Sequence, residues 1–115
     1  MTAVHGRIWL TRGGRNFLGR GRIALLRHIE ETGSIAKAAK LMKMSYKSAW
    51  DAVDAMNNSA GCLLVERTSG GKGGGGSSLT PIARKLIAAY EKIEAEHQVC
   101  LEKLGEEIRR LFDPS

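Results

Sequence analysis

The sequence predicts a mainly α-helical fold with a small β component, of the α+β class. Apolar residues recur at helical spacing in four separate stretches of the chain. Two short segments rich in β-forming residues are interrupted by glycines, as in hairpins. The length of 115 residues suits one domain, and a hydrophobic fraction of 43% is enough for a modest core.

The stretch 33–57 predicts two short helices with a tight break at Lys43-Met44. Ser34 and Ser45 each stand before a helix, where a hydroxyl can accept from a free backbone N–H of the opening turn. The buried stripe of the first helix is Ile35, Ala38, Ala39 and Met42. The buried stripe of the second helix is Ala49, Ala52, Val53, Met56 and Ala60. Small alanines on both stripes allow the two helices to cross closely.

This layout is that of a helix-turn-helix, whose second helix enters the DNA major groove by its N-terminal residues. Here those residues are Ser45, Tyr46, Lys47 and Ser48. The face opposite the buried stripe also carries Trp50, Asp51 and Asp54. A capped helix pair that binds nothing is the alternative from this stretch alone, since such motifs have false positives.

The distribution of charge favours nucleic-acid binding. The chain has 18 Lys and Arg against 12 Asp and Glu. Residues 1–83 hold 12 basic and 5 acidic side chains, a net charge of +7, whereas residues 84–115 hold 6 and 7, a net charge of −1. A localised basic surface is typical of phosphate binding. A general solubility charge does not explain this asymmetry.

The N-terminal residues 4–18 predict a β-hairpin. The β-rich segments Arg7–Thr11 and Asn16–Leu18 flank Gly13-Gly14, which suits a two-residue turn with positive φ. We expect Ile8, Leu10 and Phe17 on its buried face. The surrounding arginines either extend the basic surface or are only solvated: Arg7, Arg12, Arg15, Arg20 and Arg22. A first helix over residues 20–32 follows, ending at Gly33.

A strand over Leu63–Thr68, a glycine-rich loop over residues 69–78 and a second strand at Leu79-Thr80 come next. Pro81 is well placed at the first position of a following helix. This order, a helix-turn-helix followed by two strands joined by a loop, predicts a winged helix with Lys72 in the wing. The loop is not a P-loop, because Lys72 is followed by glycine rather than Ser or Thr. A flexible linker is the remaining alternative.

A long helix is predicted from Pro81 onward. Its apolar or weakly polar residues follow a heptad seam. After Ala83 the members of the seam are Leu86, Tyr90, Ile93, His97, Cys100 and Leu104. Such a seam predicts a partner helix, with a symmetric homodimer as the default. Packing of the helix against its own domain is the alternative.

The residues resemble a known family. The run SYKSAWDA at 45–52, LVER at 64–67 and GGKGGGG at 70–76 are similar to the N-terminal DNA-binding domain of the ModE-type, molybdate-responsive bacterial regulators, which are distantly LysR-like. The resemblance covers about residues 4–100. It implies a winged-helix DNA-binding domain that dimerises through its hairpin region and last helix. Full-length family members continue into molybdate-binding modules, so we expect a single-domain form to which molybdate does not bind.

The sequence offers little for other classes of function. Cys62 and Cys100 lack the spacing of a metal site, and no nucleophile–base pair is evident, so we expect no metal, no cofactor and no enzyme activity. No apolar run reaches the roughly 18 residues of a membrane span, and the N-terminus lacks the order of a signal peptide. We therefore expect a cytoplasmic protein with free thiols.

The sequence thus predicts a winged helix-turn-helix over residues 1–83 and a C-terminal dimerisation helix over residues 84–115. We expect a sequence-specific transcriptional regulator that binds double-stranded operator DNA as a homodimer. A winged-helix module that binds proteins and not DNA is the alternative. The expected DNA contacts are Ser34, Lys43, Ser45, Tyr46, Lys47, Ser48, Trp50, Arg67 and Lys72.

Overall fold

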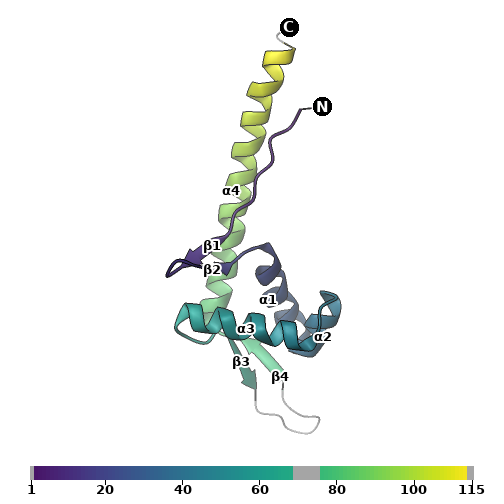
Figure 1. Ribbon diagram of the computed structural model, residues 1–115, viewed down its shortest axis with the longest axis vertical. Helices are drawn as coiled ribbons and strands as arrows, with labels where there is room; N and C mark the ends of the chain where they lie inside the picture. The colour runs from purple at the N-terminus through teal and green to yellow at the C-terminus, as the bar shows by residue number, and fades with distance from the viewer. Residues whose placement is uncertain (1, 69–75, 114–115) are drawn as a thin grey trace. The chain divides into compact units, whose positions relative to one another are not determined.

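A computed structural model describes residues 2–68 and 76–113 (Figure 1). The elements in chain order are β1 (Leu10–Arg12), β2 (Arg15–Leu18), α1 (Arg20–Thr32), α2 (Ile35–Leu41), α3 (Tyr46–Ala60), β3 (Val65–Thr68), β4 (Gly76–Leu79) and α4 (Pro81–Phe112). This order confirms the α+β class and the winged-helix arrangement.

The chain forms two compact units, which are described separately. One unit comprises Trp9–Leu86 and holds the three helices α1 to α3 with both hairpins. The other comprises the residues up to Ile8 together with those from Ile87 onward. The N-terminal segment thus belongs with the C-terminal part of α4. The predicted boundary between residues 83 and 84 stays a prediction.

The N-terminal hairpin pairs β1 with β2 in antiparallel register. Gly13 and Gly14, with φ of 60° and 76°, confirm the predicted turn. The strands lie closer to the turn than predicted, and Leu10 pairs with Leu18 across a β-bulge. A bulge breaks the alternation of faces, so both Phe17 and Leu18 are buried. The prediction missed Leu18 and wrongly included Leu10, which is only half-buried.

The core of the larger unit lies among α1, α2 and α3. α1 begins and ends as predicted, and Gly33 closes it in the left-handed region at φ 68°. The buried residues of these helices are Ile23, Leu25, Leu26, Ile29, Ile35, Ala38, Ala39, Ala49, Val53 and Met56. Most residues of the two predicted stripes are therefore confirmed as buried. The other three members, Met42, Ala52 and Ala60, are half-buried.

The hairpin of β3 and β4 pairs Val65 with Leu79 at one end and Thr68 with Gly76 at the other. The predicted strand bounds were wrong at both strands: β3 does not include Leu63, which is exposed, and β4 begins three residues before Leu79. The polar sequence Gly76-Ser77-Ser78 forms a strand because the N–H of Ser77 donates to the carbonyl of Gly33 at 2.8 Å. At Gly76 a Cβ would lie 2.7 Å from that carbonyl oxygen, so the close approach requires glycine.

The smaller unit holds α4 from Ile87 onward, with the N-terminal segment running antiparallel along it (Figure 1). The Tyr90 hydroxyl donates to the carbonyl of Ile8 at 3.3 Å, and Nη1 of Arg109 donates to the carbonyl of Thr2 at 3.0 Å. Between them, Gly6 lies against the His97 ring. One side of α4 is thus covered within the chain. None of the helices in the described part of the chain is long and apolar enough to cross a membrane.

Candidate nucleic-acid interface

The first turn of α3 is held by the side chain of Ser45, the residue that caps the helix. The Ser45 hydroxyl accepts from the N–H of Ser48 at 3.0 Å and donates to the Ser48 hydroxyl at 2.9 Å. Lys43, in the turn between α2 and α3, adopts φ 55°, which is uncommon for a residue with a side chain. The side chains of Ser45, Tyr46, Lys47 and Ser48, which follow this turn, are all exposed.

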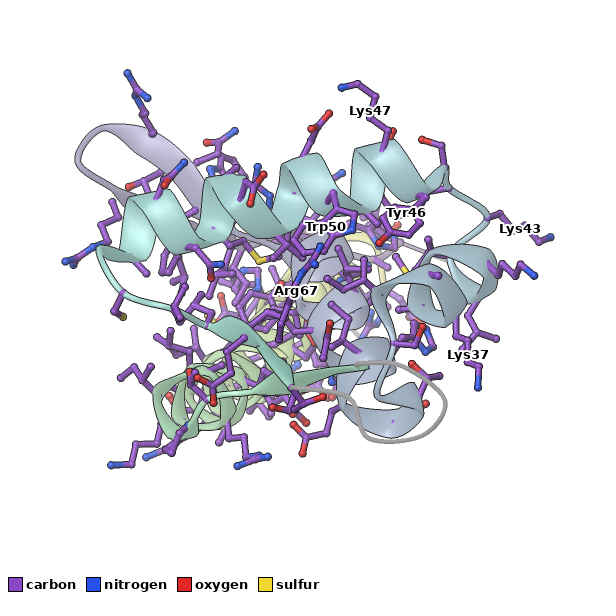
Figure 2. The ribbon with its side chains drawn as sticks, turned by 90° about the horizontal axis from the view of Figure 1, so that it is seen from below. Lys37, Lys43, Tyr46, Lys47, Trp50 and Arg67 are labelled. Atoms are coloured by element: carbon purple, nitrogen blue, oxygen red, sulfur yellow. The ribbon has the colours of Figure 1, made fainter. Side chains whose placement is uncertain are left out.

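Lys47 points outward from α3 into solvent (Figure 2). Its Nζ lies 2.8 Å from Oδ2 of Asp51, one helical turn further along. The hydrogen bond that Lys47 donates to Asp51, and then the negative charge of Asp51, raise the pKa of the Lys47 ammonium above its usual value. Lys47 therefore stays charged at neutral pH, so it can bind a phosphate or an acceptor on a base edge.

An open groove with a volume of about 330 Å³ lies beside α3, between the start of α2 and the β3–β4 hairpin. Its lining is mostly polar and includes Ser34, Tyr46, Trp50, Arg67, Thr68 and Ser77. The Tyr46 and Trp50 rings are stacked, with centroids 6.2 Å apart and planes 19° apart. The guanidinium carbon of Arg67 lies 4.6 Å from the centroid of the Trp50 ring. Figure 2 shows these three side chains gathered between α3 and β3.

The structure groups the predicted DNA contacts into two neighbouring sets. Ser34, Tyr46, Trp50 and Arg67 line the groove, and Ser45, Lys47 and Ser48 form the exposed first turn of α3. Lys43 projects from the turn before α3, away from the groove residues (Figure 2). Lys72 lies outside the described residues. Ser34 also caps α2, since its hydroxyl accepts from the N–H of Lys37 at 3.1 Å.

Two residues at this surface were not singled out from the sequence. Lys37 is exposed on α2 and projects away from the helix (Figure 2). The first helix of a helix-turn-helix crosses the DNA backbone, and this rule was the signal that could have singled out Lys37.

Asn57 joins α3 to the start of β3. Its Oδ1 accepts from the N–H groups of Leu64 and Val65 at 2.8 and 3.3 Å, and its Nδ2 donates to the carbonyl of Val65 at 3.4 Å.

Two of the arginines around the N-terminal hairpin form hydrogen bonds to backbone carbonyls. Nε of Arg12 donates to the carbonyl of Ser59 at 2.8 Å, and Nη1 of Arg22 donates to the carbonyl of Phe17 at 2.8 Å. These two arginines bond backbone carbonyls of their own unit. Among the residues that the structure describes, no group of His, Cys, Asp and Glu could hold a metal ion, and both cysteines are free and exposed.

Part of this sequence is similar to known proteins. Residues 21–84 match the family described as "Bacterial regulatory helix-turn-helix protein, lysR family". The chain is 48% identical to the molybdenum transport protein ModE of Azotobacter vinelandii over 90 residues, and these make up 78% of this chain and 33% of that protein. It is 45% identical to the DNA-binding transcriptional dual regulator ModE of Escherichia coli K12 over 86 residues, and these make up 75% of this chain and 33% of that protein.

A third relative is the molybdenum-pterin-binding protein MopB of Rhodobacter capsulatus, 54% identical over 78 residues, which make up 68% of this chain and 29% of that protein. The chain therefore spans about a third of the length of the curated relatives it matches. These similarities confirm the resemblance to the N-terminal part of ModE-type proteins. The family match covers α1 through the start of α4, the elements that build the described surface, and the chain belongs to the lysR family of bacterial regulatory helix-turn-helix proteins.

Proposed function

We propose that this chain is the DNA-binding domain of a transcription regulator and that it binds duplex DNA with α3 in the major groove. The observation that carries the proposal is the exposed first turn of α3, whose Lys47 is charged and directed into solvent. Family membership and the similarity to a DNA-binding dual regulator give it independent support.

The roles follow from position on the helix-turn-helix. Tyr46 and Lys47, on the first turn of α3, reach base edges, because the N-terminal residues of a recognition helix approach the groove floor. Lys37 on α2 and Lys43 in the turn before α3 bind the phosphate backbone. Arg67 extends the phosphate contacts to the hairpin. Phosphate contacts position the domain, and base contacts specify the sequence.

The proposed assembly is a homodimer that reads two half-sites about one helical turn apart. Of the predicted dimer residues, Tyr90 and His97 face the N-terminal segment of their own chain, and Leu86 is half-buried. Ile93, Cys100 and Leu104 are exposed on α4. Ile108 and Leu111 continue that apolar line toward the end of the helix and are also exposed. This uncovered line supports α4 pairing with α4 of a second copy.

The direct test is fluorescence anisotropy with a labelled pool of random duplexes and the matching single strands. We expect the duplex to bind more tightly, and the logarithm of the association constant to fall linearly with the logarithm of salt concentration. Lys37→Ala and Lys43→Ala should each reduce the magnitude of the slope by about 1, as for one phosphate contact.

The matched control is Lys85→Ala, which removes an exposed lysine from α4, outside the proposed interface. It should leave the slope unchanged. No binding to duplex at low salt would overturn the proposal in favour of a winged-helix module that binds proteins.

A further inference from the structure

We propose that Trp50 is a positioning residue that holds the Arg67 guanidinium in place for a phosphate of the duplex backbone. This inference rests on the proposed DNA-binding function and deepens it. In this arrangement Trp50 touches no DNA itself. It links the recognition helix α3 to the strand β3, so that both elements present their charged groups together.

The geometry is that of a cation–π contact flanked by a second ring. The Arg67 guanidinium lies over the Trp50 ring, with its carbon 4.6 Å from the ring centroid. The Tyr46 ring stacks on Trp50 at a centroid distance of 6.2 Å. Trp50 is half-buried, whereas Tyr46 and Arg67 are exposed. The indole is therefore held by the fold, and it supports two exposed side chains at the rim of one groove.

The stacking leaves the chemistry of Arg67 available for an anion. A guanidinium that stacks through its flat face keeps its five N–H donors in the plane, free for bidentate bonds to phosphate. Among the described residues, no carboxylate forms an ion pair with Arg67 and no oxygen accepts a hydrogen bond from it. Within the described part of the chain its donors are therefore not taken by another group, which fits a role in binding phosphate.

The energetic advantage is preorganisation. A free arginine side chain on an exposed strand loses rotamer entropy when it binds, and this loss opposes binding. The contact with Trp50 restricts the guanidinium before DNA arrives, so less of that cost remains for binding. On random duplex DNA, where phosphate contacts dominate, the loss of Trp50 should then act on affinity only through Arg67.

A double-mutant cycle on duplex affinity tests this dependence. Trp50→Leu should weaken duplex binding about threefold to tenfold, as expected for the loss of a cation–π contact that holds a DNA-binding side chain in place. In the Arg67→Gln background the same change should have almost no further effect. Trp50→Phe, which keeps a ring face for the guanidinium, should recover most of the lost affinity.

A measurement on the protein without DNA tests whether the contact between Arg67 and Trp50 exists, independently of its effect on binding. The Nε–H proton of Arg67 should show an upfield ring-current shift in nuclear magnetic resonance spectra, and Trp50→Leu should abolish the shift while thermal unfolding remains cooperative. If wild-type protein binds duplex but the effects of Trp50→Leu and Arg67→Gln are additive, Trp50 does not act through Arg67 and the inference is overturned. A wild-type protein that binds no duplex would instead refute the proposed function.

Discussion

The Nζ of Lys47 and the Oδ2 of Asp51 lie 2.8 Å apart on adjacent turns of α3, both on its exposed face. Because this partner raises the pKa of Lys47 in the folded protein, the contribution of the pair to stability is present at neutral pH. It is lost only as the pH rises through the raised pKa, above the usual lysine range. At neutral pH, therefore, DNA must compete with Asp51 for the Lys47 ammonium.

Replacing Asp51 by Asn should release Lys47. We expect the pKa of Lys47, measured by nuclear magnetic resonance, to fall toward its ordinary value. Affinity for all duplexes should rise about twofold to fivefold, because one negative charge leaves the surface and an exposed ion pair competes only weakly with DNA.

The control for this change is Asp54→Asn, which removes an exposed carboxylate of the same helix other than the one paired with Lys47. It should raise affinity without changing the pKa of Lys47. An equal effect of both variants on that pKa would show that the hydrogen bond to Asp51 does not persist in solution.

Ser45→Ala should reduce the free energy of unfolding by about 0.5–2 kcal/mol, the usual cost of losing a side-chain N-cap. The cap bonds the N–H of Ser48. Urea denaturation measures the change. Ser48→Ala is the matched control, because it removes only the exposed hydroxyl contact and keeps the backbone donor. Equal losses for the two variants would contradict a capping role.

Asn57→Ala should destabilise the fold by about 1–3 kcal/mol, because the N–H groups of Leu64 and Val65 lose their acceptor. The neighbouring Asn58 is exposed, so Asn58→Ala should change the unfolding free energy by no more than about 0.5 kcal/mol. Thermal and urea unfolding compare the two. A stable Asn57→Ala protein would mean that β3 is held to α3 without this side chain.

Leu104→Glu should convert the proposed dimer to a monomer, since it places a charge in the exposed apolar line of α4. Sedimentation velocity measures the mass. Val99 is also exposed and apolar but lies about 120° around the helix from that line, by the α-helical repeat. Val99→Glu should therefore remain dimeric. A dimer that survives Leu104→Glu would place the interface elsewhere on the chain.

The helix-turn-helix could be predicted closely from the sequence, because its signals are local. Hydroxyl caps at Ser34 and Ser45 and a glycine at position 33 fix the helix ends, and apolar spacing fixes the buried faces. The exposed side chains of α3 follow directly from that periodicity. The groove residues Tyr46 and Trp50 were therefore among the predicted contacts.

Features that depend on distant contacts could not be predicted in the same way. β4 contains glycine and serines of weak β propensity, and it is fixed by the bond from Ser77 to Gly33 across the domain. The heptad pattern did not reveal that the N-terminal segment covers Tyr90 and His97. The sequence of α3 did not identify Asn57 either, since an asparagine in a helix gives no sign of which backbone groups it will bond.

The central claim is that the first turn of α3 reads DNA sequence, and selection from a random duplex library tests it most directly. The wild-type protein should enrich a defined motif. Lys47→Ala, which preserves helix propensity, should relax the preference at one position of each half-site, with a loss of about 1–3 kcal/mol in discrimination. An enriched motif that is identical for both proteins, or no enrichment with the wild-type protein, would contradict the account.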